Sequence, residues 1–307
     1  MCITSSRSIL DNTFIGVWDI EHKLYGYRHV LAYQNRVKNL DATPNCMLLH
    51  IPSAQEIKPD WIVNTTANQN FLTELYNITD PPVENDGMDW MSSGTIRTNY
   101  VVENGVYHIA ILNDVSKSAV EDTLKHIPKS KLPKLNDDLI EFFAKRFPRF
   151  PLLLCCFNNQ NSKQASPILV HYPPIYPTRL MANTIESHGG LPNIDEKVSY
   201  HQKLIFGTQL KNASSKVNNI YQVVPQDFNT ELNSFLPTHV LGIDLKSHFI
   251  GLNRDISISL KEVHSYQIPK IRLELIGNVE SEIELMALKR SNTISLYHQK
   301  NNEHNKV

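Results

Sequence analysis

The stretch Tyr100-Val101-Val102-Glu103-Asn104-Gly105-Val106-Tyr107-His108-Ile109-Ala110-Ile111-Leu112 is the clearest structural signal in this sequence. Asn-Gly is the preferred pair for a tight two-residue turn, because both residues tolerate positive φ. Valine and isoleucine on both sides are strand formers. The sequence therefore predicts a two-stranded hairpin over 100–112 that turns at Asn104-Gly105.

The chain after this hairpin predicts two helices and a buried strand. Ser116 is a helix-capping residue type and begins a segment that runs to about His126. A second helix is expected to begin at Asn136 or Asp137 and to stop at Pro148. The run 151–157, Pro-Leu-Leu-Leu-Cys-Cys-Phe, is apolar on both faces, which is typical of a central strand. We expect its partner to be 168–172.

The flanking regions read mostly as strands. Strands are expected at 14–20, 25–33, 46–51 and 198–210, with a strand pair over 238–260 turning at 253–255 and a hairpin over 271–287. A helix is expected over 71–76, where the apolar spacing lengthens and Phe71, Leu72, Leu75 and Tyr76 suit one helical face. A second short helix is expected over 178–187, ending at His188-Gly189-Gly190. Meandering strands with helices gathered in the middle of the chain predict an α+β fold with a mainly antiparallel sheet.

No composition break marks a linker, so we expect a single α+β domain over 1–289 followed by a polar, flexible tail over 290–307. Lys+Arg 30 against Asp+Glu 31 gives a net charge of −1, which disfavours nucleic acid as a partner. No apolar run approaches the roughly 20 residues that span a bilayer. Four scattered cysteines suit reduced thiols in a soluble, cytoplasmic protein.

Motifs that mark common cofactor and catalytic sites are absent from the sequence. It contains no G-x-G-x-x-G, no Gly-rich phosphate loop, no H-E-x-x-H, no C-x-x-C pair and no G-x-S-x-G. We therefore expect no cofactor. These absences favour a non-catalytic domain that binds a protein or a small molecule, and two enzymatic alternatives stay open.

The first alternative is a cysteine amidohydrolase that uses Cys2. Removal of Met1 would leave Cys2 with a free α-amino group, which can act as the base for its own thiol. The opening Met1-Cys2, together with Trp18-Asp19-Ile20-Glu21, resembles the choloylglycine hydrolase and penicillin V acylase family. The resemblance implies that Asp19 lies near the nucleophile. Gly16 and Val17 stand where that family keeps an arginine, and the likeness covers roughly 20 residues.

The second alternative is a metal-dependent enzyme. His188, His201 and His239 lie near the ends of predicted elements, and histidines on loops can converge on a metal ion. Their spacing matches no known ligand pattern, and chance clusters are expected among 13 histidines. A metal site on these three residues is therefore a hypothesis that only the fold can support.

Segment 80–99 is the candidate for partner binding. It contains Pro81-Pro82, Gly87 and Gly94 among acidic residues, which is typical of a long surface loop. Asp86 and Trp90 would bind a ligand or a partner there, since exposed tryptophan is enriched in protein interfaces. Cys155 and Cys156 have apolar neighbours and are expected to be buried and inert.

Overall fold

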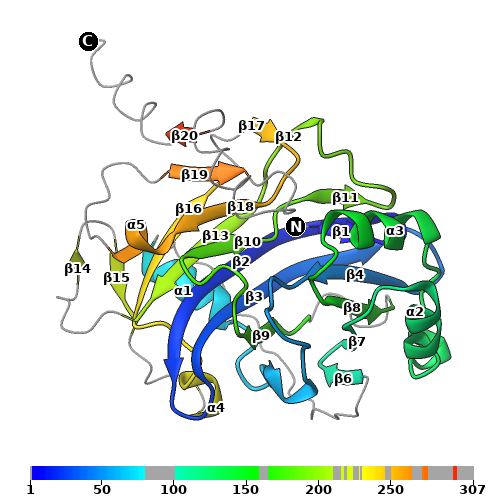
Figure 1. The fold of residues 1–307 in the computed structure, drawn as a ribbon, viewed down its shortest axis with the longest axis horizontal. Coiled ribbons are helices and arrows are strands. Elements are labelled where there is room, and N and C mark those ends of the chain that lie inside the picture. The colour runs from blue at the N-terminus through cyan, green and yellow to red at the C-terminus, as the bar shows by residue number, and fades with distance from the viewer. Residues whose placement is uncertain are drawn as a thin grey trace.

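The computed structural model describes residues 2–79, 101–158, 165–209, 216–217, 220–223, 228, 230–245, 250–264, 272–275 and 293–295. Two large sheets make up most of it, with one helix packed on the larger sheet and the other helices toward the edges of the molecule (Figure 1). Most strand pairs are antiparallel. The α+β fold class expected from the sequence is confirmed. None of the helices in this described part is long and apolar enough to cross a membrane.

The larger sheet has eight strands in the order β14-β15-β16-β13-β2-β3-β9-β5. Its centre is a long, bent hairpin of β2 and β3, which spans the molecule in Figure 1. The strand bounds are β2 (Ser8–His22), β3 (Gly26–Asn39), β5 (Ile62–Val63), β9 (Ile168–Tyr172), β13 (Lys203–Thr208), β14 (Lys216–Val217), β15 (Ile220–Gln222) and β16 (His239–Asp244).

The smaller sheet has six strands in the order β11-β1-β4-β8-β7-β6. Its strands are β1 (Cys2–Thr4), β4 (Asn45–His50), β6 (Val101–Asn104), β7 (Tyr107–Leu112), β8 (Leu152–Phe157) and β11 (Glu186–His188). A third sheet has the strand order β10 (Arg179–Ala182), β18 (Ile256–Ser259), β19 (Arg272–Leu275) and β20 (Thr293–Ser295). A fourth sheet pairs β12 (Lys197–Ser199) with β17 (Ile250–Leu252).

Alternation along β2 gives the larger sheet two apolar faces. Ile15 and Val17 join the main hydrophobic cluster, which also contains all of β8. Trp18 and Ile20 belong to a second cluster on the other face, together with Phe235. This alternation follows from the two-residue period of a strand, and it places one sheet between two apolar layers.

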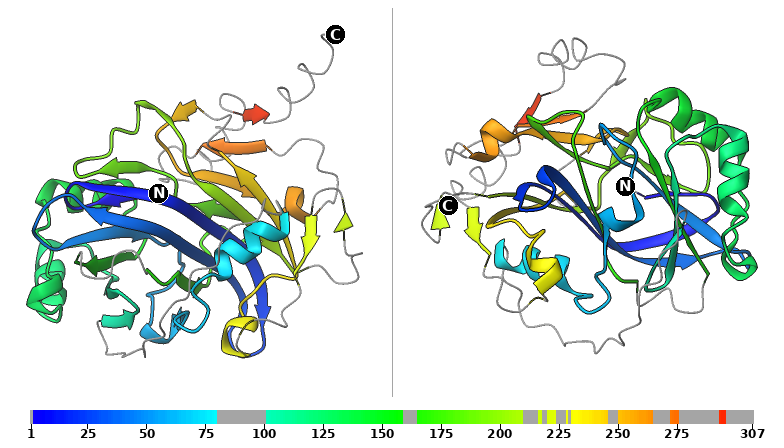
Figure 2. Two further views of the ribbon diagram at one scale, coloured as in Figure 1. Left: turned by 180° about the vertical axis from the view of Figure 1, so that it is seen from behind. Right: turned by 60° about the horizontal axis from the view of Figure 1, so that its bottom comes forward.

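The helices occupy two places. Helix α1 (Phe71–Thr79) packs on the larger sheet and buries Phe71, Leu72, Leu75 and Tyr76. Helices α2 (Lys117–Leu124) and α3 (Asp137–Arg146) lie together at one end of the molecule (Figure 2). The other helical segments are α4 (Thr230–Asn233), α5 (Leu260–His264), η1 (Pro59–Trp61) and η2 (Lys129–Lys131).

The predicted hairpin over 100–112 is confirmed as β6 and β7, but its turn is wrong by one residue. Asn104 pairs with Tyr107, so the two loop residues are Gly105 and Val106. The Asn104 side chain is buried, and its amide donates to the carbonyl oxygen of Pro167 at 2.9 Å. A contact 63 residues away therefore holds Asn104 in the strand, and Gly105 provides the positive φ of +59°.

Gly105→Ala is expected to lower the free energy of unfolding by about 1–2 kcal/mol, the cost of the left-handed region for a residue with a Cβ. The added Cβ would also lie 2.5 Å from Ser166 Oγ. The control is Gly190→Ala, because nothing lies within 4 Å of a Cβ there. Urea denaturation of both variants tests this, and equal midpoints for the two would contradict it.

Three sequence predictions about pairing and local structure were wrong. Strand β8 lies between β4 and β7, whereas β9 (the expected partner) lies between β3 and β5. The expected helix over 178–187 is instead strands β10 and β11. The segment 238–260 forms strands as expected, yet β16 pairs with β13 and β15, and β18 pairs with β10 and β19.

Several expectations fall on residues that the structure does not describe. These are the loop at 80–99, the second strand of the expected hairpin over 271–287, and most of the tail at 290–307. Within that tail only β20 is described, and it pairs with β19. The single domain over 1–289 stays a prediction.

Candidate functional site

Helices α2 and α3 form the walls of a groove on the surface. Asn136 caps α3, since its side-chain oxygen accepts a hydrogen bond from the backbone N–H of Asp138 at 2.9 Å. Apolar residues on one side of each helix face the body of the protein. Helix α2 contacts β7, and Leu139, Ile140 and Phe143 of α3 are buried. The two helices are therefore fixed against the sheet with their opposite faces exposed.

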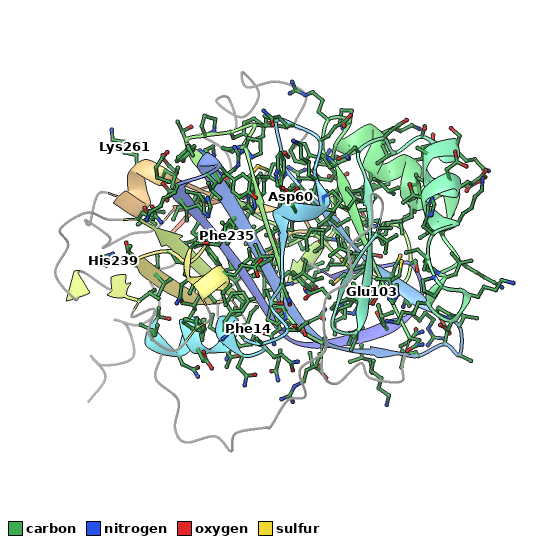
Figure 3. All side chains as sticks on the ribbon, turned by 90° about the horizontal axis from the view of Figure 1, so that it is seen from below. Phe14, Asp60, Glu103, Phe235, His239 and Lys261 are labelled. Atoms are coloured by element: carbon green, nitrogen blue, oxygen red, sulfur yellow. The ribbon has the colours of Figure 1, made fainter. Side chains whose placement is uncertain are left out.

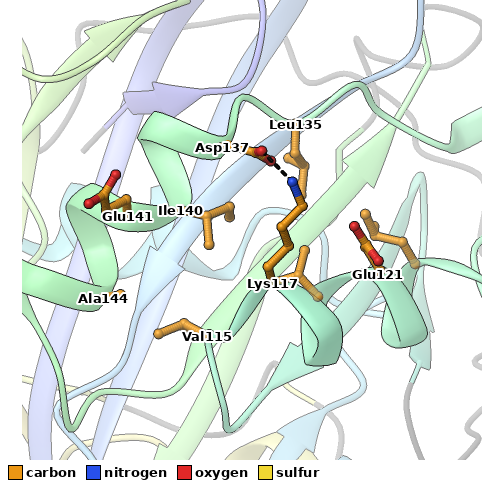
Figure 4. Close-up of a pocket in the computed structure, with 10 residues that line it drawn as sticks. Val115, Lys117, Glu121, Leu135, Asp137, Ile140, Glu141 and Ala144 are labelled. Atoms are coloured by element: carbon orange, nitrogen blue, oxygen red, sulfur yellow. Dashed lines mark hydrogen bonds and ion pairs between the residues drawn. The ribbon is translucent and has the colours of Figure 1, made fainter.

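The groove has a volume of about 490 Å³, within the range of ligand pockets (Figure 4). Its lining is mainly aliphatic, and these residues are Val115, Val120, Leu124, Leu135, Ile140 and Ala144. Charged side chains stand at its margin, namely Lys117, Glu121, Asp137 and Glu141. An apolar floor with a charged rim is the form of a groove that receives an amphipathic chain segment.

The rim is acidic. Glu121, Asp137 and Glu141 against Lys117 give the lining a net charge of −2. Lys117 Nζ lies 2.6 Å from Asp137 Oδ2 and joins the two helices across the groove. The hydrogen bond and the negative charge of Asp137 raise the pKa of Lys117. Glu141 pairs with Lys145 one turn later in α3, and Glu121 is exposed.

Cys2 and Asp19 lie in strands of different sheets. Cys2 begins β1 in the smaller sheet, where it pairs with Glu186. Asp19 lies in β2 of the larger sheet, opposite His29. Cys2 as a nucleophile stays a prediction, and selective labelling of a processed N-terminus tests it.

Asp19 lines a second, more open pocket of about 560 Å³ beside Tyr27 and Lys261. Lys261, labelled in Figure 3, lies at the periphery on α5. The Tyr27 hydroxyl donates to the carbonyl oxygen of Pro177 at 3.0 Å and lies 3.1 Å from His29 Nε2. Burial lowers the pKa of His29 to about 4, against the opposing charge of Asp19. His29 is therefore a neutral, buried ring behind the pocket.

The three histidines of the metal hypothesis do not share a site. His188 ends β11 and His201 precedes β13, and both are exposed. His239 begins β16, is buried, and has Nδ1 2.9 Å from Thr238 Oγ1. Across the described residues no group of three or more His, Cys, Asp or Glu is arranged to hold a metal ion.

The remaining candidate residues are Asp86, Trp90, Cys155 and Cys156. Asp86 and Trp90 lie outside the described residues. Cys155 and Cys156 are fully buried in β8, which confirms their expected burial. Burial raises the pKa of both thiols, and their inert character stays a prediction.

Sequence reasoning missed two polar clusters. His50 Nε2 lies 2.5 Å from Asp255 Oδ2, and both side chains are buried. Glu103, His108 and Lys131 form a second set of polar contacts beside the β6–β7 hairpin. Neither cluster has a local sequence motif. His50 and Asp255 are 205 positions apart in the chain, and His108 and Lys131 are 23 positions apart. One signal was available in the sequence. It predicted the hairpin, and in the observed register of that hairpin Glu103 and His108 lie opposite each other on neighbouring strands.

Comparisons with known proteins give structural likeness alone. No family model matches the chain, and no curated protein matches it. The solved structures that match include baculovirus P35, at 13% identity over 96% of this chain and 88% of that one, with a TM-score of 0.42. Mutated baculovirus P35 after caspase cleavage matches at 12% identity over 81% and 97% of the two chains, with a TM-score of 0.41. At these identities and scores the likeness carries no argument about function.

Proposed function

We propose that this chain is a non-catalytic protein-binding domain, and that the groove between α2 and α3 binds a basic amphipathic segment of a partner protein. The observation that supports this is the combination of an aliphatic floor with a rim of net charge −2. Apolar side chains of the partner would fill the floor. Lysine or arginine beside them would meet Glu121 and would compete with Lys145 for Glu141. Burial of the apolar floor supplies affinity, and the rim selects the sign of the partner's charge.

The test uses two synthetic amphipathic peptides that share one leucine face, with lysine on the polar face of the first and glutamate on that of the second. The lysine peptide is expected to bind the full chain, and the glutamate peptide is not. Glu121→Lys combined with Glu141→Lys is expected to weaken binding of the lysine peptide by at least about tenfold, roughly 1.4 kcal/mol. Fluorescence anisotropy measures both affinities.

The matched control is Asp122→Lys combined with Asp138→Lys. It makes the same change in net charge on the same two helices, but neither residue lines the groove. Unchanged binding by this control together with loss in the rim variant supports the proposal. Equal weakening by both variants would mean that overall charge, and not the groove, attracts the peptide.

Segment 80–99 is a second surface that the sequence favours for a partner, through Asp86 and Trp90. Trp90→Ala in the full chain tests that hypothesis with any partner found.

A further inference from the structure

Three side chains at the β6–β7 hairpin form a continuous polar chain that the groove does not use. His108 Nε2 lies 2.9 Å from Glu103 Oε1, and His108 Nδ1 lies 2.9 Å from Lys131 Nζ. Lys131 Nζ also donates to the carbonyl oxygen of Val106 at 2.8 Å. Figure 3 shows where Glu103 lies on this side of the molecule. Strand pairing sets the first contact, since Glu103 and His108 face each other in the register.

The order of donors along this chain is fixed by the carboxylate. Glu103 accepts, so His108 carries its hydrogen on Nε2 and presents Nδ1 as an acceptor. The acceptor nitrogen therefore faces the amine of Lys131. A nucleophile within reach of a base that a third group orients is the arrangement of activated nucleophiles in covalent catalysis.

Burial makes both basic groups release a proton more readily than they do in water. Burial lowers the pKa of Lys131, with the charge of Glu103 and the nearby Cys156 opposing. Burial and then the charge of Lys131 lower the pKa of His108, with Glu103 opposing. Lys131 is half-buried and not sealed from solvent, whereas Lys129 and Lys134 in the same connection are exposed.

We infer that Lys131 is a nucleophilic amine that forms an imine with a small aldehyde or ketone. His108 takes one proton from the Lys131 ammonium, and Glu103 holds the resulting imidazolium. The freed amine attacks the carbonyl carbon, and one N–H proton moves to the carbonyl oxygen to give a carbinolamine. His108 returns its proton to that hydroxyl, water leaves, and a protonated C=N bond remains on Lys131. The alternative is that Lys131 only ties η2 to the hairpin.

The experiment treats the full chain at pH 7 with propanal and cyanoborohydride, which reduces any imine to a stable amine, and maps the modified lysines by mass spectrometry. Lys131 is expected to be modified severalfold faster than Lys129 and Lys134, and to stay reactive at a lower pH than they do. His108→Phe and the milder Glu103→Gln are each expected to reduce the Lys131 rate and leave the two control lysines unchanged.

Thermal unfolding of each variant keeps the test interpretable. If His108→Phe does not fold, Glu103→Gln and the pH profile of the wild-type chain decide the outcome. Modification of Lys131 no faster than Lys129 and Lys134 would overturn the inference. A Lys131 rate that is indifferent to both substitutions in folded protein would overturn it as well, and would leave the purely structural role.

Discussion

Asp255→Ala is expected to lower the free energy of unfolding by about 3–5 kcal/mol, because it removes the buried acceptor of three hydrogen-bonded partners and leaves them unsatisfied. Asp255 Oδ1 accepts hydrogen bonds from the backbone N–H groups of Thr184 at 2.9 Å and Ile185 at 3.2 Å. Oδ2 contacts His50. The carboxylate thus joins the start of β18, which Asp255 precedes, to β4 and to the connection between β10 and β11. Its loss leaves His50 and two buried donors without their acceptor.

Burial alone would raise the pKa of Asp255, but the positive charge of His50 and the backbone donors outweigh it and lower that pKa. His50→Phe keeps a ring against Phe147, whose centroid lies 4.0 Å away, and leaves the carboxylate unpaired. We expect a loss of similar size. Asp195→Ala is the control, since Asp195 is 79% exposed in its pair with Arg254 and such pairs contribute about 0–1 kcal/mol. Denaturant midpoints measure all three, and an Asp255→Ala loss no larger than that of the control would contradict the account.

The free energy of unfolding is expected to fall by about 4 kcal/mol between pH 7.5 and pH 5. Burial lowers the pKa of His29 to about 4. Burial, followed by the charges of Arg28 and His22, lowers the pKa of His171 to about 3. Both rings therefore stay neutral in the folded chain at pH 5, whereas in the unfolded chain, at an ordinary pKa of 6.5, they are charged. At about 1.4 kcal/mol per pH unit below 6.5, each ring accounts for about 2 kcal/mol at pH 5.

The sign follows from the direction of the shifts. The unfolded state binds more protons than the folded state below pH 6.5, so stability is complete above that pH and is lost as the pH falls. His171→Phe removes one titrating ring and keeps an aromatic side chain against Tyr25 and Phe235, whose centroids lie 4.5 and 4.6 Å away. It is expected to remove about half of the pH dependence. Urea denaturation at the two pH values decides this, and a flat profile in the wild-type chain would refute it.

Local sequence signals predicted which segments form strands and helices. The helix at α3 was predictable because Asn136 caps it and Leu139 and Phe143 lie on one face. The strand at β8 was predictable because every residue in it is apolar. These signals depend on neighbours within a few residues, and tertiary contacts reinforced them.

Strand partners and the second half of the chain were less predictable. Thr178–Ser187 has apolar residues at mixed spacing, and its structure depends on β18 and on the carboxylate of Asp255, some 70 residues away. The turn moved from Asn104-Gly105 to Gly105-Val106 because Pro167 accepts from the Asn104 side chain. No local pattern encodes such distant contacts, so pairing requires the whole chain.

The candidate groove could not be predicted from the sequence either. Each wall is an ordinary amphipathic helix, and the acidic rim arises only when Glu121 of α2 faces Asp137 and Glu141 of α3. The absence of enzyme motifs in the sequence favoured a binding domain. The sequence pattern predicted partner binding at segment 80–99, not at α2 and α3. The groove became a candidate only once the two helices had been placed side by side.

Amide hydrogen exchange of the full chain, with and without the lysine peptide, tests the central claim most directly. The account predicts slower exchange in α2 and α3 on addition of that peptide, no change in β10 and β18, and no effect of the glutamate peptide. Protection elsewhere with α2 and α3 unchanged, or equal protection by both peptides, would contradict the proposal that this groove is the binding site.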